Sequence, residues 1–389
     1  MQGAPLRIRE FISSIMVELS SEDSFRLNVL LANKPQAIRI DESKMIVYGL
    51  SEQGEAQVSL NPTGRDEPYL KRVRELLSGH VTGSPGGYPV FLKRWTRMGQ
   101  MRDESLAQLL LLGEPEAVVA AVCSPGITDE LARRAWWAME DAENARRMLQ
   151  RDAVVQGKMG KVLAEFLLEY LPFETETEKM AESVRLILQP GLLDDDSRQD
   201  LWRKASRKLA YQVGFLQALP DHLPVASVPH PLFERAKHLF GDLAASGSAP
   251  AELLLRTLGA PGQAFLQTVR GVLKKPPTQD VVIATLDAVH GYYAALRPEG
   301  QPDASLDQLL VDAESWIVDG APPPLCSVLA EHRDFAEILQ AMRLLSGLGY
   351  GVVRPVFRDS TAMGTLMRRK LEPVVKPVDV RLSVLTGQA

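Results

Sequence analysis

A short motif that occurs twice constrains the fold of this 389-residue chain most strongly. It runs Pro-Gly, an aliphatic residue, any residue and Asp, followed by Arg four residues later and Trp four residues after that. Proline cannot continue an incoming helix, glycine suits a left-handed cap, and Asp favours the start of the next helix. The motif therefore predicts a joint between two helices. Its residues are Pro125, Gly126, Asp129, Arg133 and Trp137 in the first copy, and Pro190, Gly191, Asp194, Arg198 and Trp202 in the second.

The spacing within the motif predicts which side chains share a helix face. Asp129, Arg133 and Trp137 are each four residues apart, so an ion pair and an Arg–Trp contact are both sterically possible. The two copies are 65 residues apart, which exceeds the roughly 34–47 residues of two-helix repeats, and a solenoid needs at least about three copies. The duplication favours an α-α repeat-like body, and neither copy resembles a catalytic motif.

Helical periodicity of apolar residues dominates the chain from residue 103 onward. The connections between periodic segments are short and often contain Pro or Gly, as expected between packed helices. The fold class predicted is therefore mainly α. The predicted helices cover residues 103–112, 115–123, 129–140, 142–150, 159–171, 178–188, 195–218, 231–245, 250–258, 261–274, 279–295, 305–318 and 325–346.

The region before this body predicts a small antiparallel β element. A helix capped by Ser20 or Ser21 and ending near Ala32 comes first. Apolar or alternating segments then follow, separated by loops of hairpin length. They predict a three-stranded meander. The strands cover residues 37–40, 45–50 and 56–60, with residues 88–92 as one more candidate.

The tail of the chain also shows a strand pattern. Val378, Val380, Leu382 and Val384 alternate with polar residues, which is the period of a half-buried strand. Residues 352–357 are a second candidate strand. Because the intervening body predicts only helices, we expect the C-terminal strand to pair with the N-terminal meander.

Changes in composition and pattern divide the chain into six parts. Proline-rich segments at residues 220–231 and 320–324 mark the internal boundaries. The parts are an extension at residues 1–15, a helix and β-meander at 16–62, a basic connector at 63–102, a helical repeat body at 103–220, a second helical region at 221–319, and a C-terminal helix with an extended tail at 320–389.

Composition limits the compartment and the partners. The net charge of -5 argues against a surface devoted to nucleic acid, and no DNA-specific signal is present. The longest apolar stretch, residues 106–122, is interrupted by a Gly-Glu-Pro-Glu segment, and a membrane span needs about 20 apolar residues. Residues 1–10 lack the features of a signal peptide. Two cysteines, Cys123 and Cys326, suit a reducing compartment. We therefore expect a cytoplasmic protein, with Cys123 buried.

Two segments are basic within this acidic chain. Residues 65–97 and residues 350–389 each contain four more Lys and Arg than Asp and Glu. The first includes the candidate binding residues Lys93, Arg94, Trp95 and Arg97, whose basic and aromatic side chains are typical of an RNA- or anion-binding face. The alternative is solvated charge beside a sheet edge. Pairing of the tail with the meander would merge the two segments.

Other motifs do not indicate a catalytic centre, a cofactor or a metal site. The glycine-rich residues 83–87 lack the Lys-Ser/Thr of a phosphate loop and predict a turn. The run Asp194-Asp195-Asp196 lacks EF-hand spacing and predicts a capped helix start. No two histidines have the spacing of a helical metal site. In the pair Trp136-Trp137, we expect one side chain in the core and one half-exposed, with a partner-protein anchor as the alternative.

Several segments nevertheless resemble a known family, the DsrS proteins, which accompany the dissimilatory sulfite reductase system of sulfur-oxidising bacteria. The resemblance extends over about residues 20–220, and the family's start near Met16 fits the predicted extension. It rests on RLNVLLA at 26–32, AIRIDES at 37–43, GSPGGYP at 83–89, KRWTRMGQ at 93–100, LLGEPEAV at 111–118 and the first helix joint at 125–137.

This resemblance implies a cytoplasmic accessory or regulatory protein of stored-sulfur oxidation. Post-transcriptional control of Dsr protein production is the implied mechanism, and no catalytic or cofactor residue can be transferred. Three alternatives remain open: an RNA-binding regulator that uses the basic ends, a sulfur-transfer or other enzyme of sulfur metabolism, and a scaffold for a protein of the Dsr system. The cysteines lack the Cys-x-x-Cys arrangement common in sulfur carriers.

Overall fold

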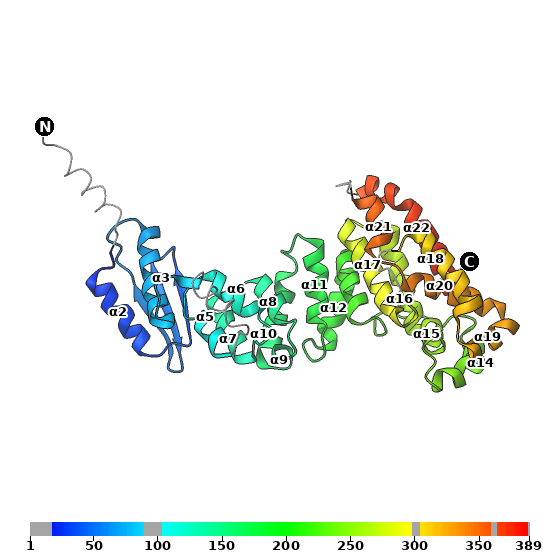
Figure 1. Ribbon diagram of the computed structural model, residues 1–389, viewed down its shortest axis with the longest axis horizontal. Helices are drawn as coiled ribbons and strands as arrows, with labels where there is room; N and C mark the ends of the chain where they lie inside the picture. Colours follow the sequence, from blue (N-terminus) through cyan, green and yellow to red (C-terminus); the bar gives the residue numbers. More distant parts are fainter. Residues whose placement is uncertain (1–17, 89–102, 298–303, 359–363, 388–389) are drawn as a thin grey trace. The chain divides into compact units, whose positions relative to one another are not determined.

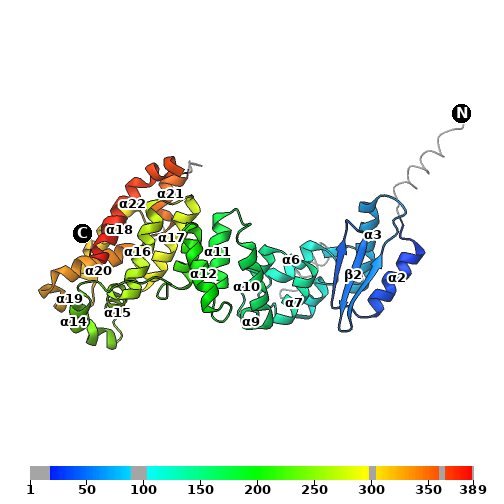
Figure 2. The ribbon, with the colours of Figure 1, turned by 180° about the vertical axis from the view of Figure 1, so that it is seen from behind.

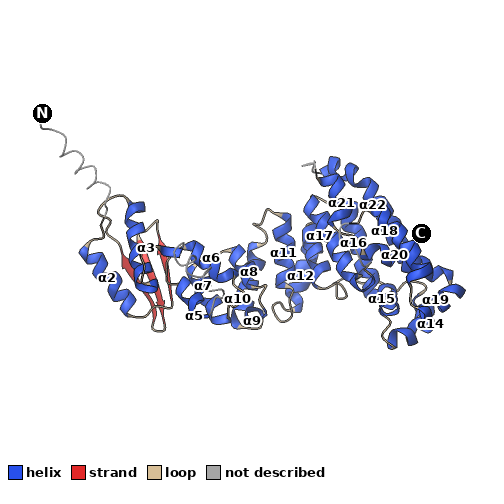
Figure 3. Ribbon diagram, viewed as in Figure 1, coloured by secondary structure: helices blue, strands red, loops and turns tan. Residues whose placement is uncertain are grey.

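The computed structural model describes residues 18–88, 103–297, 304–358 and 364–387. Helices make up most of these residues, and one antiparallel sheet lies near the N-terminus (Figure 3). The predicted fold class, mainly α with a small β element, is confirmed. The chain divides into two compact units, Met1–Leu167 and Leu168–Ala389.

The first unit begins with a helix, three strands and a second helix. The strands pair in the order β1-β2-β3, and both neighbouring pairs are antiparallel. The three predicted strands and the helix before them are therefore correct. The elements are α2 (Ser21–Ala32), β1 (Ala37–Asp41), β2 (Ile46–Ser51), β3 (Gly54–Ser59) and α3 (Asp66–Thr82).

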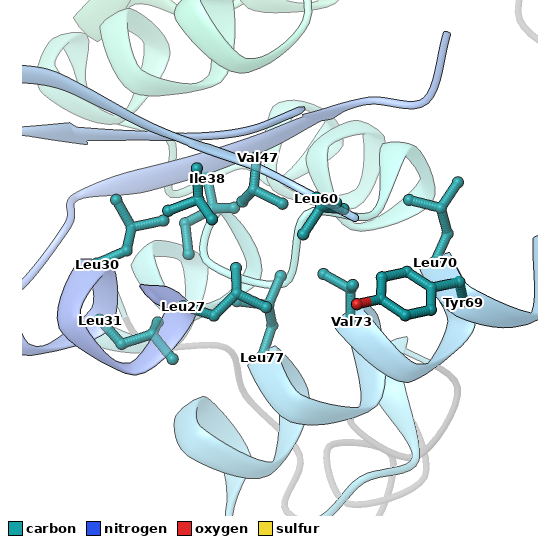
Figure 4. Close-up of a cluster of buried hydrophobic side chains, with 11 residues drawn as sticks. Leu27, Leu30, Leu31, Ile38, Val47, Leu60, Tyr69, Leu70, Val73 and Leu77 are labelled. Carbon is teal, nitrogen blue, oxygen red and sulfur yellow. The ribbon is translucent and has the colours of Figure 1, made fainter. Parts of the chain in front are cut away.

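Two helices cover one face of this sheet. Figure 4 shows buried side chains of α2 and α3, including Leu27 and Leu77, gathered against Ile38 and Val47 of the strands. The helix α3 comes from the segment predicted as a basic connector, so this segment contributes to the core of the first unit. Figures 1 and 2 show the sheet between α2 and α3 on one side and α5 to α7 on the other.

A buried carboxylate ties α2 to the end of the sheet. Ser20 caps α2 as predicted, and its Oγ accepts a hydrogen bond from the backbone N–H of Asp23 at 3.0 Å. The fully buried side chain of Asp23 accepts hydrogen bonds from the hydroxyl of Tyr69 and from the backbone N–H of Asn61, the latter at 2.7 Å. Because these donors replace water, the carboxylate can be buried in this core.

The remainder of the first unit is helical. The helix α7 packs against β1, and the backbone N–H of Ile38 donates to the carbonyl of Leu110 at 2.8 Å. Both contacts cover the outer side of β1. The helices are α5 (Asp103–Leu109), α6 (Pro115–Cys123), α7 (Asp129–Ala138), α8 (Ala142–Met148), α9 (Asp152–Val155) and α10 (Lys158–Tyr170), whose last residues belong to the second unit.

Every secondary-structure element among the described residues of the second unit is a helix. Two helices that the sequence predicts as continuous are divided, at 206–208 and at His332, where Lys208 and His332 leave the helical backbone conformation. The elements are α11 (Thr177–Ile187), α12 (Asp195–Ala205), α13 (Leu209–Ala218), α14 (Phe233–Ala245), α15 (Ala249–Leu258), α16 (Ala260–Lys274), α17 (Gln279–Tyr292), η1 (Ala294–Leu296), α18 (Leu306–Ser315), η2 (Trp316–Gly320), α19 (Pro323–Glu331), α20 (Arg333–Ser346), α21 (Tyr350–Phe357) and α22 (Gly364–Thr386).

The predicted strands of the tail are wrong, because residues 352–357 lie in α21 and residues 378–384 in α22. The helix α22 packs against α16 and α20 and buries Val374, Val378 and Leu382, which are spaced four residues apart. The alternating apolar residues are two apart, so a helix places every second one of them, such as Val378 and Leu382, on the same face. The described sheet contains only the three N-terminal strands. The tail therefore adds no strand to it, and the basic segments do not merge through a shared sheet.

Candidate functional site

The candidate binding residues Lys93, Arg94, Trp95 and Arg97 lie outside the described residues. Also outside lies most of the candidate strand at 88–92, of which only Tyr88 is described, in a helical conformation. The first unit contains a groove of about 640 Å³ whose lining includes Tyr88. Tyr88 lies five residues before Lys93 in the sequence. The groove beside it is therefore the candidate site among the described residues.

Residues from four parts of the first unit line the groove. The helix α3 contributes Lys71, Arg74 and Glu75, and the turn between β1 and β2 contributes Glu42. The glycine-rich segment and the start of α6 supply the remainder. These residues are Pro85, Gly86, Gly87, Tyr88, Glu114, Pro115 and Glu116.

Internal hydrogen bonds fix the glycine-rich segment against α3. The buried Ser78 hydroxyl donates to the carbonyl of Ser84 at 2.7 Å and accepts from the backbone N–H of Gly87 at 2.8 Å. Gly87 has a φ of +62°, and a Cβ there would collide with the carboxylate of Glu114. The glycines therefore allow a tight turn, in agreement with the turn predicted for this segment.

Glu114 holds the other side of the same turn. Its carboxylate accepts a hydrogen bond from the backbone N–H of Tyr88 at 3.2 Å. Burial raises the pKa of this carboxyl, and the hydrogen bond from Tyr88 and the charge of Arg74 partly offset the rise. Arg74 also pairs with Glu42 across the groove.

The charge of the groove is acidic overall. Among its described lining residues, the four carboxylates of Glu42, Glu75, Glu114 and Glu116 outnumber the cations of Lys71 and Arg74. Glu75 pairs with Arg72 at 2.6 Å and Glu42 with Arg74. These pairs neutralise two of the four carboxylates and leave Glu114 and Glu116 beside Lys71. Phosphate groups bind where cations dominate, and cations do not dominate this lining.

The two predicted helix joints differ in their capping. In the first joint the Thr128 hydroxyl caps α7, and Asp129 instead accepts hydrogen bonds from the backbone N–H groups of Lys158 and Met159 at the start of α10. In the second joint Asp194 caps α12 itself through the backbone N–H of Ser197 at 2.7 Å.

The glycines, arginines and tryptophans of the joints also differ from one copy to the other. Gly191 has a φ of +82°, whereas Gly126 has no positive φ. Arg133 pairs with Glu130, and Arg198 with Asp195, so the arginine of each joint has an ion-pair partner other than the motif's own Asp. Trp202 packs edge-on against Phe215. The joints thus share their sequence register but not their contacts.

Trp137 takes part in a cluster that sequence reasoning missed. Its indole N–H donates to the carboxylate of Glu55 at 2.8 Å, and the guanidinium of Arg39 lies 4.8 Å from its ring centroid and 4.7 Å from that of Tyr48. The cation beside Trp137 is therefore Arg39 rather than the Arg133 considered from spacing. Its neighbour Trp136 is buried against Phe166, so the expected division between core and half-exposed side chain is confirmed.

The predicted burial of Cys123 is wrong, because its side chain is exposed at the end of α6. The apolar run before it remains helical and turns Ala121 and Val122 inward, which leaves Cys123 on the outer face. A guanidinium N–H of Arg151 donates to the carbonyl of Cys123 at 3.1 Å.

Within the described ranges, no three His, Cys, Asp or Glu side chains are grouped to hold a metal ion. Nor is any described helix both long enough and apolar enough to cross a bilayer. Comparisons of the chain with family models, with curated proteins and with solved structures gave no match.

Proposed function

We propose that the chain is a non-enzymatic, cytoplasmic accessory protein that supports oxidation of stored sulfur by the Dsr system. The pathway rests on the resemblance of about residues 20–220 to the DsrS proteins. The proposed mode of action is binding of a basic segment of a partner protein in the groove between α3 and α6. Post-transcriptional control of Dsr protein production would be the regulatory outcome of this binding.

The observation that carries the binding mode is that Glu114 and Glu116, which form no ion pair with an arginine among the described residues, line the groove beside a single unpaired cation, Lys71. Ser78 and Glu114 hold the glycine-rich turn by hydrogen bonds, so the lining is organised before a ligand arrives. A lining of this kind favours Lys and Arg side chains, because complementary charge raises association rates and excludes partners of like charge. Preorganisation also reduces the ordering cost of binding.

Affinity purification of the tagged full chain from sulfur-grown cells tests the proposal, with co-purified proteins read by mass spectrometry and RNA by sequencing. We expect a Dsr-system protein with the wild type and its loss with Glu116→Lys. Glu165→Lys, which reverses an exposed carboxylate of α10 in the same unit, is the matched control and should retain the partner. Equal recovery by both variants would reject the groove as the binding site.

RNA binding through the basic segment is the second candidate, favoured by the cations at Lys93, Arg94 and Arg97. In this case RNA would be enriched in the same purification and lost with Arg94→Glu combined with Arg97→Glu. Binding would also weaken steeply with salt. Absence of RNA retention at low salt would reject this candidate.

Sulfur transfer is the third candidate, and the exposure of Cys123 favours it. Incubation with polysulfide followed by intact-mass measurement would then show a persulfide that is lost with Cys123→Ser. An unmodified wild-type mass would reject this candidate.

A further inference from the structure

The two edges of the three-stranded sheet differ in how they are covered. At β1 the outward N–H of Ile38 donates to the carbonyl of Leu110, and α7 packs against the strand. At β3, the backbone N–H groups of Glu55, Gln57 and Ser59 donate to no other element among the described residues. An open edge is a template for pairing with another strand.

The register of the sheet identifies the outward-facing groups of β3. The backbone N–H of Leu60 donates to the carbonyl of Met45 at 2.8 Å, in continuation of the β2–β3 register. Hydrogen-bonded pairs alternate along an antiparallel ladder, so Gly54, Ala56 and Val58 face β2. The N–H and C=O groups of Glu55, Gln57 and Ser59 therefore point away from the sheet.

An apolar strip runs beside this edge. Phe25 and Val29 lie on adjacent turns of α2, and their side chains are 69% and 46% exposed. Together with Ala56 and Val58 they line a groove of about 410 Å³ between α2 and β3. No proline or lysine lies in β3 to prevent edge-to-edge pairing.

We propose that β3 pairs antiparallel with β3 of a second copy of this chain, forming a dimer with one continuous six-stranded sheet. The register symmetric about Gln57 sets Gln57 opposite Gln57 of the second copy and Glu55 opposite Ser59 of the second copy. Each of the three resulting residue pairs exchanges two backbone hydrogen bonds. Phe25 and Val29 of both copies then lie on the same face beside the new strand pair.

Complementarity of this register favours a second copy as the occupant. No like charges are opposed, because Glu55 meets a serine and Gln57 meets a glutamine that can donate and accept. On the other face, Ala56 is opposite Val58 of the second copy, an apolar pair beside the apolar strip. Since α7 and Leu110 cover the β1 edge, the pairing closes at two copies instead of extending into a fibre.

Light scattering coupled to size exclusion tests the dimer with the full chain. At roughly 100 µM, well above a micromolar dissociation constant, we expect the wild type to have the mass of two chains. Gln57→Pro removes an N–H that points away from the sheet, so the monomer keeps its ladder. The loss of the central hydrogen bonds should raise the dissociation constant about 10- to 100-fold. Gln57→Thr keeps the N–H and should remain dimeric.

A cross-link tests the register independently of the mass. In a background with Cys123→Ser and Cys326→Ser, Gln57→Cys should form an intermolecular disulfide under mild oxidation, because opposed residues lie within disulfide reach. The control Glu52→Cys, in the exposed loop before β3, should not. A wild type that remains monomeric at this concentration, or a dissociation constant that Gln57→Pro leaves unchanged across a dilution series, would overturn the proposal. A monomer that binds an extended peptide along β3 would also overturn it.

Discussion

The strand β2 and the helix α22 both contain apolar patterns that predict a strand, a continuous run in β2 and an alternation in α22, but they fold differently. In β2, Val47 and Gly49 face the core, and Tyr48 and Leu50 are only half-buried. In the tail, the alternating residues 378–384 lie in a helix of 23 residues. Alternation alone therefore does not distinguish a strand from one stretch of an amphipathic helix.

The surroundings of each pattern account for the difference. The strand β2 is bounded by two tight turns and pairs with a strand on each side, which completes its backbone hydrogen bonds. The tail extends its apolar positions in steps of four and three, through Leu371, Val374, Val378, Leu382 and Leu385, all of them buried. A helix satisfies the backbone within itself and buries this longer stripe against α16 and α20.

The largest expected effect contrasts two residues that a strand would place on one face. Leu382 is fully buried and Val380 is 58% exposed. We expect Leu382→Ala to lower the free energy of unfolding by about 2–5 kcal/mol, and Val380→Ala by at most about 0.5 kcal/mol. Urea denaturation of each variant measures this difference. Similar losses for both would support a strand instead.

The next largest effect is expected from truncating a buried side chain in β2, which corresponds to Leu382→Ala in α22. Val47 is fully buried beneath α2 and α3, so Val47→Ala should lower the free energy of unfolding by about 2 kcal/mol through lost burial and a small cavity. Its neighbour on the opposite face is the control, because Ile46→Val should cost clearly less. Equal costs at these two positions in the same denaturation assay would contradict the alternation in β2.

Replacing a proline in the helix tests its backbone. Pro373 lies inside α22 on the exposed side and cannot donate to the carbonyl four residues earlier. We expect Pro373→Ala to restore this hydrogen bond and to raise the free energy of unfolding by about 1 kcal/mol. Increased helical circular dichroism should accompany the change. A destabilised variant would indicate that the backbone conformation set by Pro373 is required for packing.

The smallest effect is a pH dependence of stability that has opposite sign for a carboxyl group of the first unit and one of α22. Burial raises the pKa of Glu114, so the stability that its protonated form provides is present below the unfolded pKa and lost as pH rises through the folded pKa. In α22, Lys376 lowers the pKa of Glu372. The stability that the charged form of Glu372 provides is present above the unfolded pKa and is lost as pH falls through the folded pKa. In thermal melts at a series of pH values, the melting temperature of Glu114→Gln should rise relative to that of the wild type as pH rises. The stability that Glu372→Gln loses relative to the wild type should become smaller as pH falls.

Much of the helical body is predictable from sequence because its boundaries are local. Thr128 and Asp194 cap helices, and the connections contain Pro or Gly. The tail is not predictable in this way, because the burial of Leu382 depends on contacts with helices distant in sequence. In the candidate site, the glycine-rich turn is predictable, whereas its hydrogen bonds with Ser78 and Glu114 are not. The contact of Arg39 with Trp137 likewise requires tertiary packing, with pairing of β1 and β2 bringing Tyr48 alongside.

Calorimetry with the purified full chain measures whether the groove of the first unit binds a basic protein segment, as we propose. A lysine- and arginine-rich peptide and a single-stranded RNA would be titrated at two salt concentrations. We expect the peptide to bind more weakly at the higher salt, Glu116→Lys but not Glu165→Lys to abolish binding, and RNA to give no signal. RNA binding with no response to the peptide would contradict this proposal.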